Sequence, residues 1–224
     1  VDVHTHIASP DNVESVSKAA AIGGTTSMIV MAGTHKDESL LESVQNWKEK
    51  ARTSSIDYSF HPIIRGAHYS DELLDDIPLL AEQEGITSIK MFMAYKAGSM
   101  VNDTMMYKVM KKAAESNIIS CVHAENGDLI DELVRESILN GDTEPIYHAH
   151  TRPPIVEAEA TARALTIAEV ANAPVYIVHV SCREALEEVE RAKKRGVNAW
   201  AETCPHYLVL DIESLKRPHF EGAK

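Results

Sequence analysis

Residues 175–203 read VYIVHVSCREALEEVERAKKRGVNAWAET, two short apolar runs separated by a charged, periodic stretch. The runs Val175–Val180 and Val197–Thr203 are rich in β-branched and aromatic residues, which is typical of strands. The stretch Arg183–Arg195 has the spacing of an amphipathic helix, and Gly196 follows it as a stop signal. Strand, helix and strand in this order predict a βαβ unit with parallel strands.

The same alternation extends over the whole chain. The further strand-like runs are Val1–His6, Thr25–Val30, Tyr58–Ile64, Thr87–Ala94 and Ile118–Ala124. The helix-like stretches between them include Glu38–Arg52, Asp71–Glu84, Thr104–Ser116, Leu129–Leu139 and Ile155–Ala171. Because the strands are apolar on both faces, we expect them to be buried in a parallel sheet. Ser181 and Glu184 have the spacing of a capping box for the last helix.

Strands that alternate with helices predict an α/β fold, either a doubly wound sheet or a (β/α)8 TIM barrel. The barrel is favoured because polar residues recur at the carboxyl ends of the strands, where barrels build their active sites. The sequence has neither a Gly-x-Gly-x-x-Gly motif nor a Walker-type loop, so a nucleotide-binding open sheet lacks support. We expect one domain, residues 1–224, that holds strands 1 to 7 of the barrel without its last βα unit and terminal regions. We interpret Val1 and Lys224 as the ends of a piece of a longer protein.

The composition argues against several classes of partner. With 22 basic and 34 acidic residues the net charge is −12, which disfavours binding to nucleic acid or to an anionic membrane surface. No apolar run approaches the roughly 20 residues that span a bilayer. The 3 cysteines are too few and too scattered for a disulfide framework. We therefore expect an intracellular, cytoplasmic protein.

Histidines stand at the ends of three strand-like runs. His4 and His6 end the first run, and side chains at i and i+2 of a strand point the same way. His123 and His179 each end a later apolar run. One such histidine alone is more typical of a packed core residue. In a barrel the four converge on one region, and because neutral imidazole is a common zinc ligand, they predict a metal site.

A lysine lies among large apolar residues in the run that ends at Tyr95. Lys90 follows Ile89 and precedes Met91, and a buried ammonium is costly unless it is paired, neutralised or modified. The ammonium group can snorkel to water while its stem crosses apolar surface. Alternatively, CO2 adds to the amine and gives a carbamate that bridges two cations. The spacing alone leaves both interpretations open.

Motifs along the whole chain carry a family resemblance. They are Asp2–His6, Gly23-Gly24-Thr25-Thr26, Lys90–Lys96, Val122–Asp128, Thr151-Arg152-Pro153-Pro154, His179-Val180-Ser181 and Glu202–Leu208. In this order they resemble the dihydropyrimidinase/D-hydantoinase family of cyclic amidohydrolases, within the amidohydrolase superfamily. The resemblance implies a binuclear metal-dependent (β/α)8 barrel that opens cyclic amides.

The resemblance also implies roles for individual residues. His4 and His6 hold one metal ion, and His123 and His179 hold the other. Lys90 carries a CO2-derived carbamate that bridges both ions, and Tyr95 meets the substrate carbonyl. The ions are expected to be Zn²⁺, with Mn²⁺, Co²⁺ or Ni²⁺ as alternatives, and a hydroxide that bridges them attacks the ring carbonyl.

The implied function is hydrolytic opening of a 5,6-dihydropyrimidine, as in pyrimidine catabolism, or of a 5-substituted hydantoin. An allantoinase- or dihydroorotase-like activity is the alternative within the enzyme class. A non-catalytic scaffold like the collapsin-response-mediator proteins is disfavoured because the five implied ligands are present. The expected partner is a small cyclic amide, and relatives suggest a homo-oligomer, a tetramer.

Three departures from the family pattern affect these expectations. The last metal-binding aspartate of the family lies on the eighth strand, beyond Lys224, and so do the later segments whose Ser and Asn backbone groups hold the substrate ring. The loop after His6 is short, and this puts the choice of substrate in doubt.

Other candidates are assigned structural roles. His148-Ala149-His150 repeats the His-x-His spacing, but we expect it to lie in a turn and not to form a second metal site. His61 is expected to be a packed core residue and Cys204 a small buried thiol. Met91, Met93, Met105, Met106 and Met110 are expected to fill the core.

Overall fold

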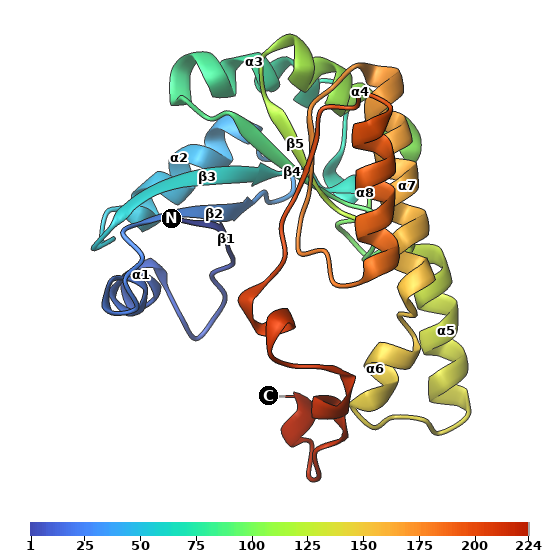
Figure 1. Ribbon diagram of the computed structural model, residues 1–224. Helices are drawn as coiled ribbons and strands as arrows, with labels where there is room; N and C mark the ends of the chain where they lie inside the picture. Colours follow the sequence, from blue (N-terminus) through green and yellow to red (C-terminus); the bar gives the residue numbers. More distant parts are fainter. Residues whose placement is uncertain (224) are drawn as a thin grey trace.

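The strands form one parallel sheet whose order follows the chain (Figure 1). The computed structural model describes residues 1–223. The strands are β1 (Asp2–Thr5), β2 (Ser27–Gly33), β3 (Asp57–Ile63), β4 (Ser88–Phe92), β5 (Ile119–His123), β6 (Val175–Ile177) and β7 (Ala199–Ala201). Each strand pairs with the next one in parallel, which gives a curled seven-stranded sheet. The predicted α/β class and all seven predicted strands are confirmed.

The helices are α1 (Val13–Ile22), α2 (Leu40–Ala51), α3 (Leu73–Glu84), α4 (Asp103–Glu115), α5 (Gly127–Leu139), α6 (Ile146–His150), α7 (Pro154–Ala171) and α8 (Arg183–Lys194). Most of them cover the outer, convex face of the sheet, whereas α5 and α6 lie below the sheet in the view of Figure 1. Packing of α2 on α3, α3 on α4, α4 on α7 and α7 on α8 makes one continuous outer layer. The predicted helix ranges are confirmed to within a few residues at each end, and α1 and α6 are additional helices.

The core lies between the sheet and this layer of helices. Every residue of β4 is buried, as expected for a central strand of a parallel sheet. Met91, Met93, Met106 and Met110 are buried, and Met105 is partly buried against the same core, as predicted.

The two outermost strands differ from the expectation of burial on both faces. β1 and β7 form the edges of the sheet, where each has a neighbour on only one side. Val3 in β1 is 38% exposed and Trp200 in β7 is 55% exposed. The prediction was wrong for these two strands because an apolar run looks the same at the edge of a sheet as at its centre.

The predicted capping box of α8 is also wrong. Cys182 is the N-cap residue of α8 and makes no side-chain cap hydrogen bond. Ser181 instead uses both its backbone N–H and its hydroxyl to contact the carboxylate of Glu157 on α7. A partner from a distant part of the chain thus replaces the local one.

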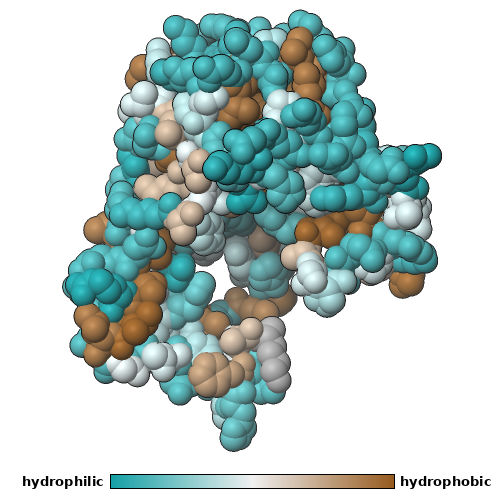
Figure 2. Space-filling model, turned by 180° about the vertical axis from the view of Figure 1, so that it is seen from behind, coloured by the Kyte–Doolittle hydropathy of each residue, from teal (hydrophilic) through white to brown (hydrophobic). Residues whose placement is uncertain are grey.

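The described residues contain no helix that is both long and apolar enough to cross a membrane. The rear face of the molecule is largely hydrophilic, with apolar side chains gathered in separate patches (Figure 2).

Candidate metal centre

His4 and His6 face each other at the carboxyl end of β1. Their Nε2 atoms are 3.2 Å apart, and their ring centroids are separated by 5.1 Å. His4 lies within the strand and His6 just beyond it, so the two side chains point to the same side.

His123 and His179 form a second pair at the ends of β5 and β6. Nδ1 of His123 lies 2.8 Å from Nε2 of His179, and the ring centroids are 4.6 Å apart. His179 follows β6 with a backbone φ of 42°, in the left-handed region that side chains other than glycine rarely adopt. Such strain costs on the order of 1–3 kcal/mol and is most common at functional sites.

The two pairs are contiguous. The ring centroid of His179 is 5.4 Å from that of His4, which links the pair on β1 to the pair on β5 and β6. The structure therefore brings together the four histidines that the sequence singled out.

Lys90 lies in the interior, on β4. Its side chain is fully buried, and Nζ has no hydrogen-bond partner. Burial lowers the pKa of Lys90 to about 7, although the charges of Cys121 and Glu202 act in the opposite direction. A buried amine without a partner is rare in folded proteins, because an unsatisfied polar group costs free energy. At this pKa a substantial fraction of the Lys90 amine is neutral near pH 7.

Both histidines of the second pair are held neutral. Burial, the partner histidine and the charge of Lys90 lower the pKa of His179 to about 2. The pKa of His123 is also lowered, mainly by burial and against the hydrogen bond to Glu125. Neutral imidazole has a ring-nitrogen lone pair that can bind a metal ion.

These residues fit a metal centre by their donor set. Two nitrogens that share a tetrahedral zinc ion lie roughly 3.3 Å apart, close to the separation of Nε2 of His4 from Nε2 of His6. Within residues 1–223, no three His, Cys, Asp or Glu side chains are grouped as the ligands of one metal ion. The candidate donors instead form two histidine pairs, with the Lys90 amine as an additional buried donor.

Two carboxylates that the sequence analysis did not assign contact these histidines. Glu202 follows β7 and bonds to Nδ1 of His4. Oε2 of Glu125 lies 2.7 Å from Nε2 of His123. Both glutamates are part of the quoted motifs, but only the structure shows that each meets a histidine.

The surroundings keep both carboxylates ionised. Burial acts to raise the pKa of Glu125, but the hydrogen bond to His123 and the nearby charges lower it overall. The pKa of Glu202 is lowered in the same way by His4 and by the hydroxyl of Tyr176, which donates to its Oε2 over 3.2 Å.

Tyr95 lies beside the second histidine pair, in the loop after β4. Its ring centroid is 5.2 Å from that of His123, and its φ of 68° is in the left-handed region. The Tyr95 carbonyl accepts hydrogen bonds from the backbone N–H groups of Gly98, Ser99 and Met100, which hold this turn. Burial, aided by the charge of Glu125, raises the pKa of Tyr95, so its hydroxyl stays protonated near neutral pH.

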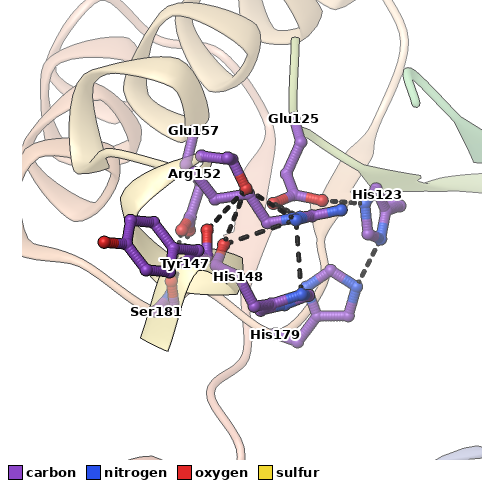
Figure 3. A network of polar contacts seen from close by, with 9 residues as sticks. His123, Glu125, Tyr147, His148, Arg152, Glu157, His179 and Ser181 are labelled. Carbon is purple, nitrogen blue, oxygen red and sulfur yellow. Dashed lines mark hydrogen bonds and ion pairs between the residues drawn. The ribbon is translucent and has the colours of Figure 1, made fainter. Parts of the chain in front are cut away.

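A cleft of about 430 Å³ opens beside these side chains. This volume is within the range of small-molecule binding sites. Its lining includes His6, Tyr95, His123, Arg152, His179 and Tyr207. Figure 3 shows His123 and His179 facing each other at one side of the polar network, with Glu125 between His123 and Arg152.

The other sequence candidates lie elsewhere or have structural contacts. His148 and His150 lie in α6 and not in the expected turn, and Nδ1 of His148 is 3.3 Å from Nη1 of Arg152. His61 is buried, as predicted, and its ring contacts the Ser88 hydroxyl at 2.6 Å. Cys204 is half-buried, so the expectation of a buried thiol was wrong.

Comparison with known proteins finds close relatives that are named D-hydantoinase or dihydropyrimidinase. D-hydantoinase of Ralstonia pickettii is 48% identical over 232 residues, which take in 100% of this chain and 50% of that protein. Dihydropyrimidinase of Rattus norvegicus is 40% identical over 219 residues, 94% of this chain and 42% of that protein. A solved structure of D-hydantoinase superposes with a TM-score of 0.95 at 48% identity, covering 100% of this chain and 50% of that one. No family model matches the chain.

The chain belongs to the dihydropyrimidinase/D-hydantoinase family. This confirms the resemblance drawn from the motifs. The chain spans about half the length of the curated relatives it matches. The curled sheet with its outer helices is the corresponding half of the D-hydantoinase fold.

Proposed function

We propose that this chain forms the metal-binding part of an enzyme that hydrolyses the C–N bond of a cyclic amide, a 5,6-dihydropyrimidine or a 5-substituted hydantoin. One observation carries the proposal: two histidine pairs and a buried, unpartnered lysine meet beside a cleft of small-molecule size. Relatives named D-hydantoinase and dihydropyrimidinase support this substrate class over allantoin or dihydroorotate.

The fold proposal is a (β/α)8 barrel of which residues 1–224 make up strands 1 to 7. β1 and β7 are the free edges of the curled sheet, so an eighth strand between them would close it. In such a barrel the side chains at the carboxyl ends of the strands form the active site. The eighth strand is also where the family resemblance puts the last metal-binding aspartate.

His4 and His6 would hold one divalent metal ion, and His123 and His179 the other. Zn²⁺ is the ion best suited to imidazole donors, with Mn²⁺, Co²⁺ or Ni²⁺ as alternatives. When bound, the two ions supply Lewis-acid activation of water and of the substrate carbonyl.

Lys90 would complete the centre as a carbamate. The neutral Nζ adds its lone pair to the carbon of CO2, an N–C bond forms, and one C=O electron pair moves onto oxygen. The nitrogen then releases a proton to water, which leaves a negatively charged carbamate. The lowered pKa of Lys90 supports this step, because only the neutral amine has a lone pair to give.

Tyr95 would donate its hydroxyl proton in a hydrogen bond to the substrate carbonyl oxygen. Negative charge builds up on this oxygen during attack, so the bond is stronger in the transition state than in the ground state. The raised pKa of Tyr95 keeps the donor protonated. The left-handed turn at Tyr95 holds the ring beside His123.

Ring opening by the protein loaded with zinc in bicarbonate buffer tests this function. Dihydrouracil and a 5-substituted hydantoin are offered separately, and the N-carbamoyl product is measured by chromatography. We expect product with at least one substrate and loss of the activity after chelation. A zinc-loaded protein that forms no product from dihydrouracil and none from the hydantoin would overturn the proposal. Homotetramer formation remains a prediction from the resemblance, and a cytoplasmic location remains a prediction from the composition.

A further inference from the structure

Each histidine pair contains one ring whose second nitrogen meets a carboxylate. In the first pair, Nε2 of His4 faces His6 while Nδ1 contacts Glu202. In the second pair the nitrogens are exchanged, because Nδ1 of His123 faces His179 while Nε2 contacts Glu125. The two pairs thus use opposite nitrogens of the carboxylate-bound ring.

A carboxylate can only accept a hydrogen bond, so the ring nitrogen that faces it must carry the proton. A neutral imidazole has one N–H, and its other nitrogen then has a free lone pair. Glu202 therefore keeps the proton of His4 on Nδ1, and Glu125 keeps the proton of His123 on Nε2. In both rings the lone pair points at the partner histidine.

The carboxylates are themselves held in place. The Glu202 backbone, directly after β7, is tied to β6, because its N–H donates to the Ile177 carbonyl over 3.1 Å. The Tyr176 hydroxyl donates to its side chain. Glu202 therefore cannot turn away from His4 without breaking contacts with β6.

Glu125 is held by Arg152, which lines the same cleft. Oε1 of Glu125 lies 3.8 Å from Nε of Arg152, and the side chain is 18% exposed. Nη1 of Arg152 donates to the carbonyl oxygen of His148, in α6, over 3.3 Å. The line from α6 through Arg152 and Glu125 to His123 can be followed in Figure 3.

We propose that Glu125 and Glu202 are positioning residues that fix the tautomer and ring orientation of His123 and His4, one for each metal ion. This inference rests on the metal centre of the proposed function. Hydrogen-bond partners of metal-binding histidines fix ring orientation and raise ligand basicity, and their loss weakens metal binding by about 10- to 100-fold.

The test measures zinc affinity of the full chain by competition with a coloured chelator. We expect Glu202→Ala and Glu125→Ala each to lower the affinity for one of the two zinc ions by about 10- to 100-fold. The affinity for the other zinc ion should stay at the wild-type value. Cobalt-loaded protein gives a second readout, because a reoriented imidazole changes the visible absorption of the bound ion.

Conservative variants and a matched control separate positioning from folding. Glu202→Gln and Glu125→Gln keep the side-chain volume and one acceptor oxygen, so we expect a smaller loss of affinity than for alanine. Glu157→Ala is the control, because Glu157 lines the same cleft but its hydrogen bonds go to Ser181. We expect its zinc affinity to equal that of the wild type.

The outcomes distinguish this inference from the proposed function. If the wild type binds two zinc ions and all glutamate variants bind them equally tightly with unchanged cobalt spectra, the positioning role is overturned while the metal centre stands. If the wild type binds no zinc, both are overturned. If the alanine variants do not fold, the glutamine variants decide, and wild-type affinity in both of them contradicts the inference.

Discussion

Nδ1 of His123 lies 2.8 Å from Nε2 of His179, although 56 residues separate the two in the sequence. Burial keeps both rings neutral, and the neutral rings meet nitrogen to nitrogen without charge repulsion. The parallel pairing of β5 with β6 places them at the same edge of the sheet. The seven-stranded parallel sheet thus brings histidines from distant segments of the chain side by side.

Replacement of Lys90 tests its proposed role as the fifth metal ligand, beside the four histidines. Lys90→Met keeps most of the side-chain volume and removes the amine, so we expect loss of two-metal binding and of hydrolysis. The metal-free variant should be more stable than the wild type by about 1–2 kcal/mol, because a buried group without a partner is removed. Zinc analysis, turnover and chemical denaturation measure these effects. Lys90→Ala should lose metal and activity likewise, and two zinc equivalents with normal turnover in either variant would contradict the assigned role.

Tyr95→Phe separates chemistry from metal binding. The ring remains beside His123 but its hydroxyl is gone. Loss of one donor to a developing oxyanion lowers kcat by about a hundredfold or more. We expect this fall in turnover with the zinc content unchanged, measured on the same preparation. An equal loss of zinc would mean that Tyr95 supports the metal centre and not the substrate.

Gly127→Ala tests the close packing that supports the Tyr95 turn. A Cβ at Gly127 would lie 2.7 Å from Cα of Ala94 and 2.9 Å from the Met93 carbonyl oxygen. Overpacking of this kind costs about 1–3 kcal/mol, and the displaced loop carries Tyr95, so stability and turnover should both fall. Gly98→Ala in the same loop is the control, because nothing lies within 4 Å of its added Cβ. Equal stability of the two variants by thermal unfolding would refute the packing argument.

The buried His61 should make the folded protein less stable in acid. Burial lowers its pKa from 6.5 to about 4, although its Nε2 contacts the Val3 carbonyl oxygen at 2.9 Å. The unfolded chain therefore binds the proton more readily than the folded one. The stability contributed by neutral His61 is complete above pH 6.5 and is lost as the pH falls towards about 4, by up to about 3 kcal/mol.

The measurement for His61 is chemical denaturation of metal-free protein at several pH values. His61→Gln removes the titrating group and keeps polar atoms near Val3 and Ser88. We expect its free energy of unfolding to change less between pH 7 and pH 4.5 than that of the wild type. An identical pH dependence in both proteins would rule out a contribution from His61.

The sequence predicted the strands and the proximity of His4 to His6 because these signals are local. Apolar runs and helix spacing gave the seven strands, and His4 and His6 share a face by strand geometry alone. The partners of Ser181 and His4 were not predicted. Ser181 bonds to Glu157 and not to the expected partner Glu184. Glu202 contacts His4, which lies 198 residues earlier in the sequence. These contacts depend on how the strands are ordered in space, which no local pattern contains.

The backbone at His179 and Tyr95 was also beyond sequence reasoning. Both residues have positive φ, which the sequence signals only when glycine is present. Tertiary contacts must support such conformations, since the residues themselves disfavour them. The rings of both strained residues lie beside that of His123, with centroids 4.6 Å away for His179 and 5.2 Å away for Tyr95.

The number of zinc ions bound per full chain tests the central claim most directly. The protein is stripped with a chelator, reconstituted with zinc and bicarbonate, freed of excess metal, and analysed by mass spectrometry for zinc and protein. The account predicts two zinc ions per chain in the wild type and fewer than two in Lys90→Met. A wild type that binds no zinc, or a variant that also binds two, would contradict it.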